Sequence, residues 1–300
     1  MPGLLGTRKR FGQRYRTPIE KDGDPVRRRQ LSLRIRPFIL RRTKSAVATE
    51  LPPKHTILRR ITLGQDQREL YETIRAAMHD KVLQEIATRG AAQSKILVLD
   101  ALLKLRQVCC DPRLVKLPSA QRVGTSSKLD DLLEMVTEMV AEGRRILLFS
   151  QFTSMLDLMK PALDAAAIPY VELRGDTSDR AEPVRSFEAG DVPLFLISLK
   201  AGGRGLNLIS ADTVIHYDPW WNPAVEDQAS DRAHRIGQTK SVFVYKLIAA
   251  DTVEERIVAM QERKAALATL ALSEEGQGLA ALDENDIDYL FGAAPERLAA

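Results

Sequence analysis

The stretch LFLISLKAGGRGLNL at residues 194–208 decides the fold class. Its first six residues are an apolar run of strand length, and a glycine-rich turn follows them directly. A short apolar run of this kind is typical of a strand that is buried on both faces of a sheet. The segment RILLFS at residues 145–150 has the same character, and amphipathic helical patterns separate such runs from about residue 126 onward. The alternation predicts an α/β fold whose parallel sheet is covered by helices on both faces.

The apolar spacing also places the individual elements. Strands are expected at residues 56–63, 145–150, 170–173, 194–199, 213–217 and 241–248. Helices are expected at residues 65–88, 95–110, 128–142, 154–167, 178–189, 224–235 and 253–272. The first two helices precede the regular alternation, so residues 63–120 are predicted to form a helical protrusion. Residues 121–272 are predicted to form the main lobe, and the acidic residues 273–300 a loose tail.

The composition limits the classes of protein. With 44% hydrophobic residues the chain can bury a core, and a net charge of +4 with a pI near 9.0 leans mildly toward nucleic acid. Basic residues crowd into residues 7–44, where they form either a strap that contacts phosphates or a solvated linker. No apolar run is long enough to span a membrane, and no signal peptide opens the chain, so we expect a cytoplasmic protein without a membrane partner.

The cysteines and histidines do not suggest chemistry. Cys109 and Cys110 are adjacent in an apolar stretch, which favours buried thiols and a reducing compartment. The histidines at positions 55, 79, 216 and 234 lack the spacing of metal ligands. We therefore expect no metal site built by this chain alone.

Two clusters of residues invite a phosphate. Gly202, Gly203 and Gly205 follow a predicted buried strand, and glycines there let backbone amides approach an anion, although a tight strand-to-helix turn needs them equally. Arg232 and Arg235 lie three residues apart on a predicted helix and would share one face. Such a pair either stabilises a transferring phosphoryl group or is an ordinary charged surface, and the second interpretation is favoured for two arginines alone.

Two further loops follow predicted strands. Asp218-Pro-Trp-Trp-Asn-Pro223 forms a rigid loop whose tryptophans either stack on bases or, as we prefer, pack the loop onto the domain. Ser150-Gln151-Phe-Thr and Gly175-Asp-Thr-Ser178 offer hydroxyls and helix N-termini that suit phosphate contacts, although Ser178 equally suits a simple helix cap.

The order and spacing of the motifs are more specific than any one of them. Five segments together closely resemble the second motor lobe of the Swi/Snf family in helicase superfamily two, in the form typical of bacterial members. They are ILLFSQFTSMLDL, LRGDTSDR, LFLISLKAGGRGLNL, VIHYDPWWNPAVEDQASDRAHRIGQTK and VFVYKLIAADTVEERI. PFILRRTKSAVATELPPK resembles the segment that joins the two lobes in that family. The resemblance covers roughly residues 1–265 and implies a RecA-like lobe. It makes residues 1–62 the remnant of the first motor lobe and the connector.

The resemblance also implies roles for individual residues. It makes Arg232 and Arg235 arginine fingers for ATP bound on the other lobe, with Gln228 as the polar residue that opens their motif. The glycine loop would contact nucleotide through Gly203, Gly205 and Asn207. Contacts to the backbone of double-stranded DNA would come from Ser150, Gln151, Gly175, Thr177, Arg180 and Lys200.

The chain also departs from the family pattern. Arg204 stands where a small apolar residue is expected, and Arg174 where Asp is commoner. No G-x-x-x-x-G-K-[ST] loop exists in the sequence; Gly124-Thr-Ser-Ser-Lys128 comes nearest but lacks the upstream glycine. There is also no Asp-Glu pair after a buried strand to hold magnesium. ATP and magnesium are therefore expected to be bound mainly by the first motor lobe, which this chain would need as a partner.

The predicted function is that of the C-terminal motor lobe of an ATP-dependent DNA translocase. Alone, the chain is expected to bind ATP weakly and not to hydrolyse it. The alternative is a non-enzymatic module that binds DNA or a protein partner, and a third possibility is a broken reading frame.

Overall fold

The computed structural model describes residues 5–22, 24–38, 50–90, 93–202, 205–270 and 284–292. It divides the chain into two compact units, residues 1–50 and 51–300. The described part of the first unit is helical, with α1 (Arg8–Phe11), a π-helical turn η1 (Gly12–Arg16), α2 (Thr17–Asp22), α3 (Pro25–Ile35) and the 3₁₀ turn η2 (Arg36–Phe38). The described residues of the basic stretch 7–44 are therefore mainly helical, over residues 8–22 and 25–38, and residues 23 and 39–44 lie outside the described part.

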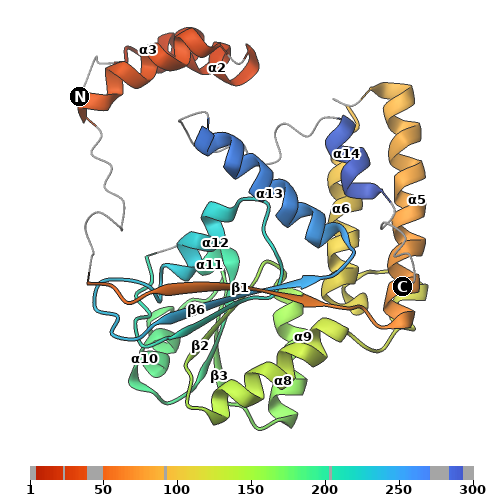
Figure 1. Cartoon of the computed structure of the whole chain (residues 1–300), viewed down its shortest axis with the longest axis vertical. Helices are drawn as coiled ribbons and strands as arrows, with labels where there is room; N and C mark the ends of the chain where they lie inside the picture. The colour runs from red at the N-terminus through yellow and green to blue at the C-terminus, as the bar shows by residue number, and fades with distance from the viewer. Residues whose placement is uncertain are drawn as a thin grey trace. The chain divides into compact units, whose positions relative to one another are not determined.

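The second unit is built on a parallel sheet (Figure 1). Its strands run in the order β1-β6-β5-β2-β4-β3, and every neighbouring pair is parallel. The strands are β1 (Lys54–Ile61), β2 (Ile146–Ser150), β3 (Tyr170–Leu173), β4 (Leu194–Ser198), β5 (Thr213–His216) and β6 (Val242–Ala249). The predicted α/β class with a parallel sheet is confirmed.

Side chains of β2 alternate between two cores, as the pleat of a strand requires. Leu148 joins a core with α8 (Ser127–Ala141) and α9 (Thr153–Ala165). Phe149 points to the other face, where α10 (Ala181–Ala189) and α12 (Pro223–Ser230) contribute to a second core. All five residues of β2 are buried, which explains why its sequence shows an unbroken apolar run.

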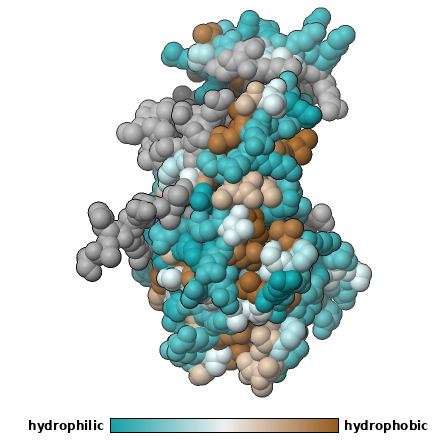
Figure 2. All heavy atoms as spheres, turned by 90° about the vertical axis from the view of Figure 1, so that its right-hand side faces the viewer, coloured by the Kyte–Doolittle hydropathy of each residue, from teal (hydrophilic) through white to brown (hydrophobic). Residues whose placement is uncertain are grey.

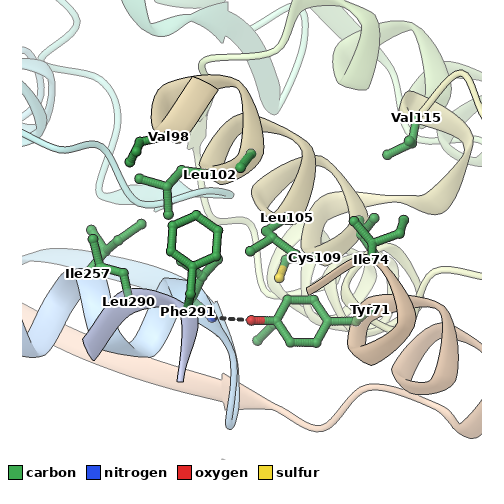
Figure 3. Packing of buried hydrophobic residues seen from close by; sticks show 14 of the residues in the cluster. Tyr71, Ile74, Val98, Leu102, Leu105, Cys109, Val115, Ile257, Leu290 and Phe291 are labelled. Carbon is green, nitrogen blue, oxygen red and sulfur yellow. Dashed lines mark hydrogen bonds between the residues drawn. The ribbon is translucent and has the colours of Figure 1, made fainter. Parts of the chain in front are cut away.

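The predicted protrusion is a pair of long helices, α5 (Gln65–Arg89) and α6 (Lys95–Cys110), which pack against each other. The short turns η3 (Pro112–Leu114) and α7 (Pro118–Gln121) lead from α6 back to the sheet. A third core joins this pair to α13 (Val253–Leu270) and α14 (Glu284–Phe291). Figure 3 shows Phe291 beside Leu102, and the Tyr71 hydroxyl accepting a hydrogen bond from the Val253 amide at 2.7 Å.

Two segments outside the predicted main lobe contribute to the core and to the sheet of the second unit. The segment predicted as a loose tail contains α14, whose Ile287, Leu290 and Phe291 are buried because they complete the apolar core of the protrusion. The segment to residue 62, predicted to precede the lobe, contains β1. That strand pairs with β6 along its whole length and so extends the sheet of the lobe.

The surface around α5 is mainly hydrophilic, with hydrophobic patches between the polar residues (Figure 2). On α5 and α6 the exposed large apolar side chains are Leu83, Ile96, Leu99 and Leu103. Within the described residues, no helix has both the length and the apolar character that crossing a bilayer requires.

Candidate functional site

The predicted motifs gather at one edge of the sheet. Ser150, Leu173, Ser198 and His216 end four strands that are all parallel, so the loops that follow leave the sheet on the same side. The sequence predicted this edge as the working edge. What the sequence did not show is how the loops are fastened to one another.

The glycine turn after β4 is a short helix, α11 (Leu199–Gly202). A β-carbon on Gly202 would lie 2.7 Å from Cε1 of Phe149, so the close packing of the turn on β2 requires glycine there. Gly205 has a φ of +59°, a left-handed conformation that glycine adopts without strain. Lys200 and Asn207 are exposed beside the turn, whereas Gly203 and the unusual Arg204 lie outside the described residues.

The arginines are not on a helix, contrary to the prediction. Helix α12 ends at Ser230, and Arg232 and Arg235 lie in the turn that follows. The turn is shaped by tertiary bonds: the Leu208 amide donates to the carbonyl of Arg232 at 3.1 Å. The buried Gln238 donates from Nε2 to three carbonyls, those of Ile209, Ala211 and Ala233. The motif QASDRAHRIGQTK contains Gln238, but its spacing alone does not indicate this structural role.

The two arginines differ in their surroundings. Arg232 is partly buried, and its Nε donates to the carbonyl of Gly202 at 3.1 Å. Burial, with a smaller contribution from the charge of Arg235, lowers the pKa of Arg232 below its ordinary value, although it stays a cation at neutral pH. Arg235 is exposed, as is Gln228 on the last turns of α12. The turn after α12 thus presents two guanidiniums: that of Arg232 is anchored on Gly202, and that of Arg235 faces solvent.

A third arginine holds the same turn. Arg180, next to the N-terminus of α10, donates from Nη2 to the carbonyl of Ala201 at 3.0 Å. Two adjacent carbonyls of the glycine turn therefore accept from arginines of two different motifs, one predicted to face DNA and one predicted to face nucleotide. This arrangement physically joins the two predicted contact regions.

The loop after β2 is held from inside the protein. Ser150 is buried and its hydroxyl donates to Oδ1 of Asp218 at 2.6 Å, while the Gln151 amide donates to the same oxygen at 3.2 Å. Burial raises the pKa of Asp218 to about 6, against the opposing effect of Arg106. The Ser150 hydroxyl, predicted to face DNA, here supports the loop, and Gln151 is the more exposed of the two residues.

The loop after β3 presents Gly175 in an exposed position and Thr177 partly buried. Thr177 Oγ1 accepts from the amide of Arg174 at 2.9 Å and so closes the loop. Arg174 pairs with Asp157 and Glu172, and its hydrogen bond to Asp157 is the largest cause of a pKa raised above the ordinary value. The unusual Arg174 is thus part of a surface ion-pair network.

The tryptophan loop after β5 is packed, which agrees with the interpretation we preferred. Trp221 lies against the core of the protrusion and Trp220 against the core under α12. The Trp220 amide donates to the buried carboxylate of Glu226, which also pairs with Lys246 at 2.6 Å.

The segment Gly124–Lys128, which comes nearest to a phosphate-binding loop in sequence, carries its lysine in the protein interior. Lys128 is fully buried and forms an ion pair with Glu254, and its Nζ also donates to the carbonyl of Tyr217 at 3.2 Å. Ser126 caps the start of α8 by accepting from the Leu129 amide. Within the described ranges, no three His, Cys, Asp or Glu side chains form a cluster that could hold a metal ion.

A parallel α/β lobe with a glycine turn, an arginine turn and strand-end loops on one edge has the architecture expected of a helicase C-terminal domain. Family comparison agrees, since residues 127–237 match the helicase conserved C-terminal domain and residues 1–114 match the SNF2-related domain. The chain belongs to the SNF2-related helicases and covers the end of the SNF2 domain and the C-terminal lobe.

Individual relatives support this assignment. YwqA of Bacillus subtilis, named as an ATP-dependent helicase/translocase, is 40% identical over 296 residues, which are 96% of this chain and 32% of the relative. The SWI2/SNF2 ATPase core of Sulfolobus solfataricus in complex with dsDNA superimposes with a TM-score of 0.65 at 31% identity, covering 98% of this chain and 62% of that one. The C-terminal domain of the same ATPase gives a TM-score of 0.63 at 27% identity, covering 81% and 100%. The chain spans about a third or less of the curated relatives it matches.

Proposed function

We propose that the chain is the arginine-bearing half of a split ATPase site in a motor that moves along duplex DNA. The observation that carries the proposal is the turn after α12, where Arg232 is anchored on Gly202 and Arg235 faces solvent. An exposed guanidinium on a rigid base can stabilise the charge that spreads over a transferring phosphoryl group. Gln228, also exposed, lies on the helix that leads into this turn.

In this proposal, the groups that bind the phosphates of ATP lie on another lobe of the motor. The sequence has no phosphate-binding loop. Lys128, the nearest candidate, is buried in an ion pair with Glu254 and so cannot reach a nucleotide. ATP and its magnesium ion would therefore bind on a first motor lobe and supply the phosphoryl group. This chain would contribute positive charge when the cleft between the lobes closes. By itself it would bind ATP weakly and turn none over.

Duplex DNA is the proposed track. The protein in the Sulfolobus structure is bound to dsDNA, and the strand-end loops of this chain offer Gln151, Gly175, Thr177, Lys200 and Arg180 near one edge of the sheet. Backbone phosphates suit amides, hydroxyls and cations of this kind. Because Arg180 and Arg232 bind adjacent carbonyls of the glycine turn, a shift of the arginine turn at each ATP cycle would be passed to the DNA-facing loops.

The second candidate is a non-enzymatic DNA-binding module. It is favoured by the arginines of the first unit, among them Arg10, Arg14, Arg27 and Arg34. Such a module needs no nucleotide. Its affinity for DNA would change with the salt concentration but not with the nucleotide.

Fluorescence anisotropy with a labelled duplex separates the two functions. The chain is titrated across salt concentrations, with and without a first lobe from a family member, and with and without a non-hydrolysable ATP analogue. A motor half predicts salt-dependent binding that the analogue changes only when the first lobe is present. Binding that ignores the analogue in every combination contradicts the motor function and supports the binding module.

A further inference from the structure

The side chain of Arg106 reaches from the protrusion into the base of the working edge. Arg106 lies on α6 and is only 2% exposed. Its Nη2 lies 3.6 Å from Oδ2 of Asp218 and donates to the carbonyl of Pro219, while Nη1 donates to Oε1 of Gln151 at 3.1 Å. One guanidinium therefore joins α6 to the loops that follow β2 and β5.

Three aromatic rings lie near this guanidinium. Its central carbon lies 5.8 Å from the ring centre of Phe152, 5.9 Å from that of Trp220 and 5.4 Å from that of Trp221. Cations at such distances are attracted by aromatic rings, and the attraction grows when water is excluded. The tryptophan loop thus surrounds an arginine that arrives from another part of the fold.

The contact dictates the orientation of the Gln151 amide. A guanidinium has only donors, so only the oxygen of an amide can face it, and the NH2 group must point away. Among the described residues, Gln151 Nε2 has no hydrogen-bond partner, although it is covered. Gln151 as a residue is only partly buried, so a rotation of its side chain would bring this covered donor to solvent. A covered donor without an acceptor is costly, and an incoming anion would relieve that cost.

We propose that Arg106 is a positioning residue that turns the amide of Gln151 so that its NH2 group donates to a phosphate oxygen of duplex DNA. The protrusion would thereby set the geometry of a DNA contact on the sheet edge. Asp218 supports the same loop by accepting from the Ser150 hydroxyl and from the backbone N–H of Gln151, and Arg106 pairs with Asp218. This inference rests on the proposed function, because it names how one of the DNA-facing loops is prepared.

The first test replaces Gln151 by glutamate. The new carboxylate would pair with Arg106, so the fold and the melting temperature are expected to hold, but the NH2 donor is gone. Ser154→Glu adds the same charge at a nearby exposed position on α9 and serves as the control. In anisotropy with a labelled duplex, Gln151→Glu should weaken binding about tenfold more than Ser154→Glu does. Equal losses for the two variants overturn the proposal.

The second test asks whether Arg106 acts through Gln151. Lysine keeps the charge at position 106, but its donors all lie on one nitrogen, so it lacks the planar fork that reaches Gln151 and Pro219 from two separate nitrogens. Arg106→Lys should weaken duplex binding in the wild-type background and have no further effect on a Gln151→Ala background. Additive losses in the two backgrounds mean that Arg106 acts independently of Gln151, and the inference fails.

The same titrations keep the inference separate from the proposed function. If the unmodified chain binds duplex with no salt dependence, the proposed DNA-backbone contact itself is wrong. If binding is salt-dependent and Lys200→Gln weakens it, while Gln151→Glu behaves like Ser154→Glu, the function stands and only the role of Arg106 is overturned.

Discussion

Arg232 donates from Nε to the carbonyl of Gly202 at 3.1 Å, and this bond joins the arginine turn to the glycine turn. Because Arg180 binds the neighbouring carbonyl of Ala201, the glycine turn is held from two sides. The arginine that faces solvent, Arg235, stands beside this joint rather than within it. The site therefore separates an anchoring arginine from an exposed one, and the two should respond differently to mutation.

Removing the exposed guanidinium should affect rate and not stability. With the first lobe supplied, Arg235→Ala is expected to lower DNA-stimulated ATP turnover by about 10³-fold or more, since it removes charge from the transition state. Its melting temperature should match that of the unmodified chain. Arg232→Ala should lower both turnover and melting temperature because it also releases Gly202. Thermal melting of both variants, followed by a coupled ATPase assay, checks this difference; equal melting losses would contradict it.

Gly202 should tolerate no side chain. Alanine there would place a β-carbon against the ring of Phe149, which is fully buried and cannot move aside. We expect Gly202→Ala to lower the free energy of unfolding by about 1–3 kcal/mol. Gly175→Ala is the matched control, because nothing lies within 4 Å of the added carbon. Urea denaturation measures both, and the prediction fails if the two variants are equally stable.

The buried carboxyl of Asp218 should make stability depend on pH in the acidic range. Its pKa in the folded protein is about 6, above the ordinary 3.8, so between these values the folded state binds more protons than the unfolded state. This group therefore makes stability fall as pH rises from about 4 to about 6, by up to about 3 kcal/mol. Asp218→Asn should lack that component.

The measurement is the free energy of unfolding of both proteins at pH 4.5 and pH 7. The difference in free energy of unfolding, taken as the Asn variant minus the unmodified chain, should be more positive at pH 7 than at pH 4.5. If this difference is the same at both pH values, Asp218 keeps an ordinary pKa and the prediction is wrong.

The buried pair of Lys128 and Glu254 should act in folding and not in nucleotide binding. Lys128→Met leaves a buried carboxylate unpaired and is expected to cost about 3–5 kcal/mol. Adding Glu254→Gln should restore much of the loss because no charge is then left alone. Denaturation of the single and double variants tests this, with titration by a fluorescent ATP analogue as control. If the double variant is less stable than the single one, the internal role of Lys128 is wrong.

The sequence predicted the scaffold well where one signal dominates. The strand at 170–173 and the helix at 95–110 have the predicted bounds, because glycines and prolines frame them and their apolar spacing is regular. The buried thiols of Cys109 and Cys110 were also predicted, and both are fully buried. Burial raises the pKa of both thiols, so they stay protonated at neutral pH.

Long-range contacts set the limit of that prediction. The residues after Ser230 keep a helical composition until Gly237, and only the bonds from Leu208 and Gln238 show that the chain leaves the helix. Arg106 looks like an ordinary charge on an amphipathic helix until α6 is placed beneath the tryptophan loop. The apolar residues of α14 are too few to indicate a helix unless the core that they complete is known.

The most direct test of a split site is ATP turnover in the presence of duplex DNA, measured for this chain, for the first lobe of a family member, and for the two together. We expect neither half to turn over ATP by itself and the mixture to recover DNA-stimulated hydrolysis that depends on Arg235. Robust hydrolysis by this chain alone would contradict the account, because the phosphate cradle would then have to lie within it.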